Sequence, residues 1–148
     1  MADRAATSAV AVLMAVILAA GCSPPKSIAR ATPKATAQAF VKAMRVADYD
    51  AVAAGFDFEA VARQRNPDWD TFGQSQQNLI IDKLEEDKAA QLEALAGMMA
   101  GEGWVGEPQM QDGHAIVPVY VAGKTIRLYM TRHEDEWKIL RIVEHAVM

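Results

Sequence analysis

Cys22 is the residue whose type and surroundings most clearly predict a chemical event, because it is the only cysteine in the 148-residue chain. A thiol is a nucleophile, but a single cysteine cannot form a disulfide within its own chain. Cys22 follows an uncharged run over residues 5–20 and precedes a serine and two prolines. That run is shorter than the roughly 20 apolar residues that span a bilayer, and it is typical of the apolar core of a secretory signal.

Residues 18–22, Leu-Ala-Ala-Gly-Cys, resemble the lipobox of bacterial lipoproteins. The resemblance implies that a diacylglycerol joins the Cys22 sulfur, that a signal peptidase cleaves after Gly21, and that the new N-terminus is acylated. Anchoring by several chains is stable, because each buried methylene contributes about 0.8 kcal/mol and one chain alone is marginal. The alternative for Cys22 is a buried structural cysteine on an apolar helix, which its position and its flanking residues disfavour.

The lipobox resemblance divides the chain into three parts. We expect a signal peptide over residues 1–21, a lipidated cysteine and tether over residues 22–31, and a single folded domain over residues 32–148. Ser23 stands where an aspartate would imply retention at the inner membrane. The mature protein is therefore expected to be lipid-anchored at the cell membrane, and on the outer membrane, facing the periplasm, if the cell is Gram-negative.

The remaining side chains do not form a pattern that predicts catalysis, metal binding or a cofactor. The histidines lack the spacing of zinc motifs, and the sequence has no glycine-rich phosphate loop, G-x-S-x-G motif or cysteine–histidine pair. A cluster of carboxylates could supply a general acid and base, but it lies at expected helix starts, where capping explains it. The histidines are His114, His133 and His145, and the carboxylates are Asp48, Asp50, Asp57 and Glu59.

Tyr120, Arg127, Tyr129 and Trp137 form the candidate ligand-binding set. If they share one face of a sheet and that face lines a pocket, aromatic rings with one arginine suit a small anionic or apolar ligand. The alternative is a sheet face that is open to solvent or covered by a partner. The set therefore depends on the elements that carry these residues.

The composition is that of one folded domain, with 51% hydrophobic residues, 23% charged residues and a formal net charge of −4. Nucleic acid is not an expected partner, because the chain has no excess of lysine and arginine to neutralise phosphates. The expected partners are the membrane, through the lipid anchor, and either an envelope protein or a small-molecule ligand.

Helices are expected in the first half of the domain. A threonine cap at Thr32, followed by proline and a helical apolar spacing, predicts a helix that ends near Ala47. Asp48 or Asp50 can cap a second short helix, and residues 58–65 can form a further turn or two. After the Asn-Pro-Asp break that follows, a long helix opening at Asp70 or Thr71 reaches about Ala100, with a bend or break plausible where charges cluster in its middle.

Strands are expected after the glycines that end the helical region, because the apolar period there changes to two. A two-residue Ala-Gly turn at residues 122–123 makes Val119 face Ile126 and Val117 face Leu128. One face of this hairpin is apolar and must be covered by the helices.

Three details of the sheet remain open in the sequence. Pro118 cannot donate to a ladder, so its strand is at an edge or locally irregular there, and residues 104–110 are a candidate first strand. A two-residue turn before the last strand puts Arg141 on the apolar face, whereas a three-residue turn with a bulge puts Leu140 and Ile142 there. The second register is preferred, because an unpaired buried arginine is costly. It moves Trp137, Ile139 and Arg141 to the other face.

The element order predicts an α+β domain, with N-terminal helices packed on a C-terminal antiparallel meander sheet of three to four strands. The Asp48-Tyr49-Asp50-Ala51 step and the hairpin pattern Gly123-Lys124, Leu128 and Glu136-Trp137-Lys138-Ile139 resemble secreted domains with the nuclear transport factor 2-like, or cystatin-like, cone fold, some described as lumazine-binding-like. The resemblance covers residues 33–145 loosely and implies a curved sheet wrapped by helices, leaving a cone-shaped pocket. Its members range from enzymes to scaffolds, so the fold alone does not give the function.

The sequence thus predicts a membrane-anchored envelope lipoprotein with a non-catalytic binding or structural domain. The alternatives are a cone-fold enzyme, such as a small hydrolase or isomerase that uses a pocket carboxylate, and a lipid-binding carrier. An enzyme needs a buried carboxylate or histidine in a closed pocket, and a carrier needs a large dry cavity. A binding domain needs only an open groove or an exposed apolar patch.

Overall fold

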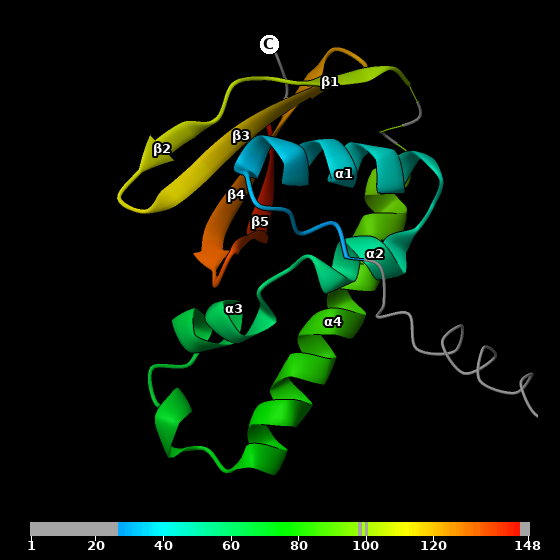
Figure 1. Cartoon of the computed structure of the whole chain (residues 1–148). Helices are drawn as coiled ribbons and strands as arrows, with labels where there is room; N and C mark the ends of the chain where they lie inside the picture. The colour runs from blue at the N-terminus through cyan, green and yellow to red at the C-terminus, as the bar shows by residue number, and fades with distance from the viewer. Residues whose placement is uncertain (1–26, 98, 100, 146–148) are drawn as a thin grey trace, which may run out of the picture.

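The computed structural model describes residues 27–97, 99 and 101–145, and Figure 1 shows their helices packed on an antiparallel sheet. Cys22, the predicted signal peptide and most of the predicted tether lie outside the described residues. The helices are α1 (Pro33–Arg45), α2 (Tyr49–Ala54), α3 (Phe58–Arg65), the short 3-10 helix η1 (Trp69–Thr71) and α4 (Gln74–Ala96). The strands are β1 (Gly103–Val105), β2 (Gln109–Gln111), β3 (His114–Val121), β4 (Lys124–His133) and β5 (Glu136–His145). The predicted α+β class is confirmed.

The first three helices begin at residues whose side chains cap them. Thr32 accepts a hydrogen bond from a backbone N–H three residues ahead (3.2 Å), and Pro33 takes the first helical position, as predicted. Asp48, rather than Asp50, caps α2 in the same way, and Asp57 caps α3. Local structure therefore explains two of the clustered carboxylates.

Helix α4 begins at Gln74, after η1, and not at Asp70 or Thr71. It continues without interruption to Ala96, so the break considered in its middle does not occur and its end comes before the expected one. Its buried side chains, Leu92 and Leu95, both lie in the C-terminal part. In the N-terminal half of α4, Ile81 and Leu84 pack against the core but are only partly buried.

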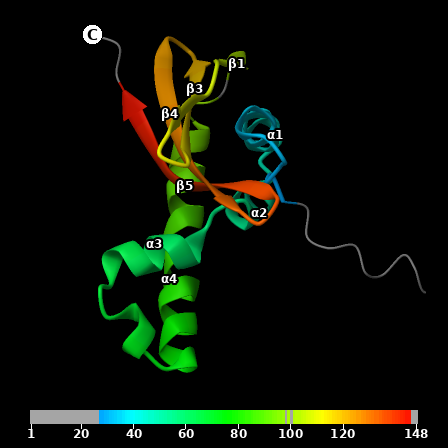
Figure 2. The same ribbon diagram turned by 60° about the vertical axis from the view of Figure 1, so that its left-hand side comes forward.

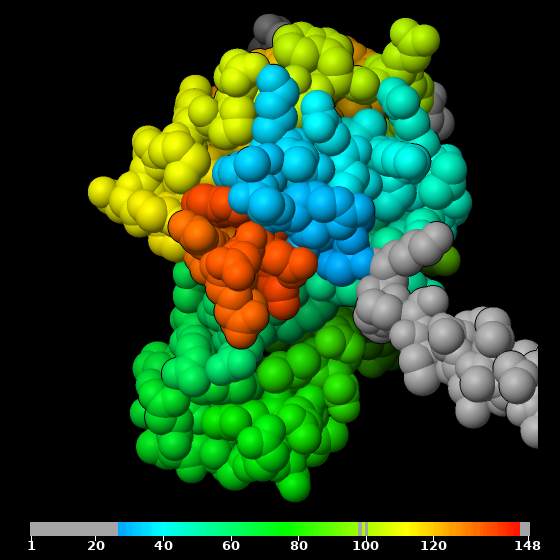
Figure 3. Space-filling model, in the orientation of Figure 1, coloured from blue at the N-terminus to red at the C-terminus, as the bar shows by residue number. Residues whose placement is uncertain are grey.

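The chain from α3 to the start of α4 forms an arm that extends away from the sheet (Figures 1 and 3). Within this arm Trp69 is buried and packs edge-on against Phe72, with 6.2 Å between the ring centroids. Arg63 joins the arm's elements, because its guanidinium pairs with Glu59 on α3 (3.1 Å) and with Asp70 on η1 (2.8 Å).

The sheet has the order β1–β3–β4–β5, and β2 also pairs with β3. Val119 faces Ile126 and Val117 faces Leu128, so the predicted register of the β3–β4 hairpin is confirmed. The turn at residues 122–123 has two residues, both with positive φ (50° and 75°), as a tight hairpin turn requires.

The single strand expected within residues 104–110 is split into β1 and β2, which gives five strands instead of three or four. The split lies opposite Pro118, which has no N–H to donate. Here the backbone N–H of Gly106 donates to the Pro118 carbonyl at 2.8 Å. A Cβ on Gly106 would lie 2.8 Å from Pro118 Cγ, so this close approach requires glycine. Of the two alternatives for Pro118, local irregularity is correct.

The turn between β4 and β5 has two residues, so the predicted three-residue turn is wrong. The bulge lies inside the ladder instead: Met130 pairs with Ile139 and Tyr129 pairs with Arg141, which leaves Leu140 as the extra residue. Before the bulge, Ile139 is fully buried, against the prediction that moved it to the other face. After the bulge, Arg141 is exposed, as predicted.

A bulge within the ladder satisfies both burial requirements at once. It lets the apolar residues at the start of β5 face the core, and it then shifts the alternation by one residue before Arg141. Ile142 faces Leu128 on the core side, as predicted, whereas Leu140 does not. The prediction that Arg141 avoids the core is therefore confirmed, although the predicted length of the turn is wrong.

The core lies between one face of the sheet, here called the core face, and helices α1 and α2 with the C-terminal part of α4 (Figure 2). The opposite face is here called the outer face. The largest completely buried side chains come from α1, α4, β4 and β5: Phe40, Leu92, Ile126, Leu128, Met130 and Ile139.

The segment before α1 belongs to the domain. Ile28 and Ala29 are buried, and the backbone N–H of Trp137 donates to the Arg30 carbonyl at 2.8 Å. The fully buried Thr36 hydroxyl accepts from the Arg30 N–H (2.9 Å) and donates to the Trp137 carbonyl (3.1 Å). The fold therefore begins before the predicted boundary at residue 32, and the predicted tether is too long at its C-terminal end.

Candidate ligand-binding cleft

Three members of the predicted ligand-binding set share the outer face. Tyr120 lies opposite Thr125, Arg127 opposite Pro118, and Tyr129 opposite Ile116, all within the β3–β4 ladder. Their side chains are partly or fully exposed. The prediction that they lie on one sheet face is therefore confirmed by the register.

Trp137, the fourth member, is not part of this face. It precedes the bulge, and its side chain is only 9% exposed and belongs to the hydrophobic core. The predicted register had assigned it to the outer face because the bulge was expected in the turn. Trp137 therefore has a packing role and is not part of the candidate binding site.

The outer face has two separate hollows. The smaller, about 260 Å³, is lined by Tyr120 and Arg127, with His145 at the end of β5. Tyr120 also stacks on the exposed Trp104 of β1, with 4.1 Å between the ring centroids. Tyr129 lies in the other hollow, so the structure separates it from Tyr120 and Arg127.

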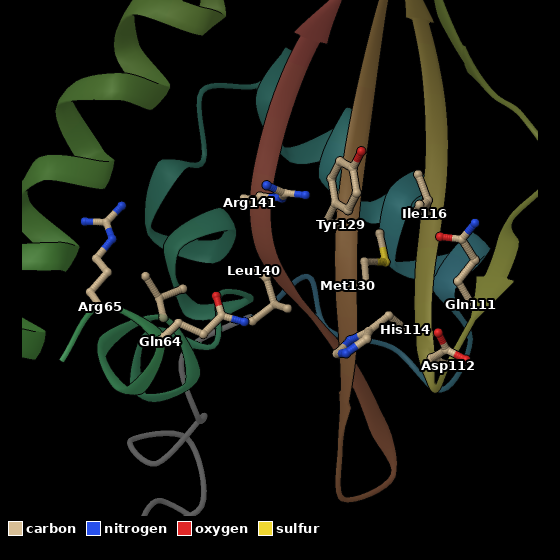
Figure 4. Close-up of a pocket in the computed structure, with 11 residues that line it drawn as sticks. Gln64, Arg65, Gln111, Asp112, His114, Ile116, Tyr129, Met130, Leu140 and Arg141 are labelled. Atoms are coloured by element: carbon tan, nitrogen blue, oxygen red, sulfur yellow. The ribbon is translucent and has the colours of Figure 1, made fainter. Parts of the chain in front are cut away.

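The larger hollow, here called the cleft, has a volume of about 520 Å³ and lies between the outer face and α3. Figure 4 shows Arg65 on the α3 side and Arg141 on the strand side, with its guanidinium group beside Tyr129. The Arg141 guanidinium carbon is 4.1 Å from the centroid of the Tyr129 ring, a cation–π contact. Charged and amide side chains complete the lining together with apolar ones: Val61, Gln64, Gln111, Asp112, His114, Ile116, Met130 and Leu140.

A smaller cavity of about 100 Å³, here called the inner cavity, adjoins the cleft. Arg65, Leu140 and Arg141 line both spaces, and Lys88 of α4 lines the inner cavity. The Lys88 ammonium lies 5.0 Å from the centroid of the Phe56 ring. The inner cavity is therefore enclosed by α3, α4 and β5, which come from three distant parts of the sequence.

Positive charge at these two spaces has little local compensation. Within the described residues, neither Arg65 nor Arg141 has a carboxylate within 4.0 Å. Lys88 donates to the neutral side-chain amide of Gln91 at 2.9 Å. Burial lowers the pKa of Lys88, and the nearby Arg65 charge lowers it further.

Sequence reasoning found Tyr129 but missed Arg65 and Lys88. Arg141 was considered only as a residue that should avoid the core. Arg65 is in the last turn of α3, where a basic residue is ordinary because it suits the helix dipole. Lys88 is in a charged stretch of α4. Nothing in the sequence distinguishes these two cations from other surface charges, because their meeting depends on tertiary structure.

The groups considered for catalysis do not converge on the cleft. His114 lines it, whereas His133 lies at the β4–β5 turn, with its Nδ1 atom 3.8 Å from Asp57 Oδ2. Asp57 already caps α3 through its other oxygen, and His133 is half exposed. Among the described residues, no three histidine, cysteine or acidic side chains are placed to hold a metal ion.

Comparisons with protein-family models, with curated proteins and with solved structures found no match to this chain. The resemblances to the lipobox and to the nuclear transport factor 2-like fold therefore stay predictions. In the part of the chain that the structure describes, no helix has the length and apolar character needed to cross a bilayer.

Proposed function

We propose that this chain is an envelope lipoprotein, anchored to the membrane through Cys22, whose domain binds a ligand in the cleft without chemical conversion. The observation that carries the binding proposal is the pair of arginines, Arg65 and Arg141, that face the cleft without a carboxylate partner among the described residues. Both arginines are exposed to solvent, so their guanidinium groups are free to form charge-assisted hydrogen bonds with an anionic group of a ligand. The anchoring proposal rests on the lipobox resemblance of residues 18–22.

The rival proposals have weaker support. A cone-fold enzyme would need an acid–base pair in the cleft. Asp112 and His114 both line the cleft, but no hydrogen bond or ion pair joins their side chains, and the Asp57–His133 pair does not line it. A lipid carrier would need a dry apolar cavity, whereas arginines, amides and an aspartate share the lining of the cleft with its apolar side chains. A cleft with this mixed lining suits a ligand that has both a charged group and an apolar group.

Mass spectrometry of the mature N-terminus and membrane fractionation test the anchor. We expect the wild-type protein to begin at an acylated Cys22 and to fractionate with membranes. Cys22→Ser should retain residues 1–21, because acylation of the thiol is expected to precede cleavage. Ser23→Ala is the matched control and should be processed normally. A wild-type protein found in the cytosol with its first 21 residues intact would overturn the anchoring proposal.

Nuclear magnetic resonance spectra recorded with a small-molecule extract of the cell envelope test the binding proposal. We expect signal changes to concentrate at the cleft, and to be lost in Arg141→Gln. Arg127→Gln removes the same charge from the neighbouring hollow and is the matched control. Changes confined to the Arg127 hollow would contradict the choice of the cleft.

A further inference from the structure

Three cationic residues from three different elements line the inner cavity: Arg65 of α3, Lys88 of α4 and Arg141 of β5, whose guanidinium group lies over the Tyr129 ring of the adjoining cleft. The Arg65 charge is close enough to Lys88 to lower its pKa, so the two cations repel each other in the free protein. This repulsion costs stability chiefly at Lys88, which is half-buried, whereas Arg65 is exposed. An anion placed among them would reverse this repulsion.

The acidic side chains near this site leave the positive charge largely unneutralised. Asp87 lines the inner cavity, but its carboxylate pairs with Lys83 at 3.0 Å. Asp112 lines the cleft from the β2–β3 turn and does not line the inner cavity. The contrast with Arg63 is informative, because that arginine, two residues before Arg65, has two carboxylate partners.

The chemistry of the three cations selects among anions. Guanidinium groups form paired hydrogen bonds with carboxylates and phosphates, and an ammonium group adds a further point charge. A carboxylate carries one negative charge, whereas a phosphate monoester carries close to two at neutral pH. Three cations therefore match a phosphate monoester better than a carboxylate.

The walls that lead out of the inner cavity indicate what the phosphate is attached to. Leu140 and Val61 line both spaces, and Tyr129 lines the cleft with its ring held by Arg141. An apolar or aromatic group would contact these side chains while its phosphate remained among the cations. Resting on the proposed binding function, we propose that the cleft and inner cavity together bind a phosphate monoester with an apolar substituent.

Such a monoester can come from a soluble metabolite or from a lipid headgroup, and calorimetry on the mature acylated protein in a non-ionic detergent distinguishes them. The soluble probe is phenyl phosphate. The lipid probe is dihexanoyl phosphatidic acid, with dihexanoyl phosphatidylcholine as a control that has the same chains but no monoester. We expect binding of at least one monoester and none of the phosphatidylcholine.

Arg141→Gln should weaken monoester binding by about tenfold or more, since each charge-assisted hydrogen bond contributes enough free energy for such a change. Arg127→Gln should leave the affinity within about twofold, because it lies outside both spaces. In the wild-type protein, monoester binding should also raise the pKa of Lys88, measured from its side-chain resonance. A thermal melt of each variant confirms that it is folded.

Each outcome has a definite meaning. Arg141-dependent binding of phenyl phosphate supports the proposal with a soluble source, and Arg141-dependent binding of phosphatidic acid alone supports it with a lipid source. Equal losses in Arg127→Gln and Arg141→Gln, or no binding of either monoester, would overturn it. Benzoate and benzamide separate this failure from failure of the proposed function: if either binds at the cleft while the monoesters do not, the binding function stands and the phosphate assignment fails.

Discussion

The two faces of the β3–β4 hairpin carry alternating residues of the same strands, yet they are specified by different physical requirements. On the core face, Val117 and Leu128 are completely buried and pair directly across the ladder. On the outer face, Arg127 and Tyr129 keep part of their surface in solvent. The core face is determined by volume and apolar contact, and the outer face by charge and access. Stability and binding should therefore respond to substitutions on different faces.

The largest expected effect is on the core face, at Trp137. Trp137→Ala should lower the free energy of unfolding by roughly 3 kcal/mol, because it removes a buried ring and leaves a cavity. Chemical denaturation of the wild-type and variant proteins measures this difference. A denaturation midpoint unchanged by the substitution would contradict the placement of Trp137 in the core.

The next effect concerns the polar contact that joins α1 to the edge of this core. Thr36→Val preserves shape but removes the hydroxyl between Arg30 and Trp137, which should lower the free energy of unfolding by about 1–3 kcal/mol. Thr36→Ser keeps the hydroxyl and is the matched control for the hydrogen bonds. If the serine variant loses as much stability as the valine variant, packing of the methyl group is more important than the hydrogen bonds.

A smaller effect is expected on the outer face. Arg127→Gln and Arg141→Gln should each change the free energy of unfolding by no more than about 0.5 kcal/mol, as is usual for exposed positions. The same denaturation experiment measures them. If either substitution lowered the free energy of unfolding as much as Trp137→Ala, the outer face would also determine stability, contrary to the proposed difference between the two faces.

The smallest effect is a change in titration. Arg65→Gln should raise the pKa of Lys88, because it removes a neighbouring positive charge while burial continues to lower the pKa. A pH titration of the Lys88 side-chain resonance measures the shift, and Arg127→Gln should leave it unchanged. A Lys88 resonance that titrates identically in Arg65→Gln would show that the two cations do not interact.

The sign of the related stability change follows from the direction of the shift. A lysine whose pKa is lowered by folding binds its proton more strongly in the unfolded chain. Stability should therefore increase as the pH rises from the folded-state pKa of Lys88 to its unfolded-state value. Arg65→Gln should narrow this pH interval, because it raises the folded-state pKa of Lys88.

The parts of the fold that depend on neighbouring residues could be predicted from the sequence. The caps at Thr32 and Asp57 and the hairpin turn at residues 122–123 each use groups a few residues apart. The bulge at Leu140 could not be placed, because the turn and the ladder both allow a shift of one residue and only core packing decides between them.

The candidate site was less predictable than the fold. Register alone was enough to place Tyr129 on the outer face, and the cost of burying a charge was enough to exclude Arg141 from the core. The partnership of Arg141 with Arg65 and Lys88 depends on where α3 and α4 lie against β5. No spacing within the sequence encodes that arrangement.

The attachment of the segment at Ile28 limits how far the domain can move if Cys22 is acylated as proposed. Ile28 is six positions after Cys22 in the sequence, and a fully extended chain of that length reaches only about 20 Å. The domain would therefore remain beside the lipid surface to which Cys22 is attached. Its ligand would have to be delivered to, or produced at, that surface. A partner on an opposing membrane would have to extend to the domain, because the domain could not extend to it.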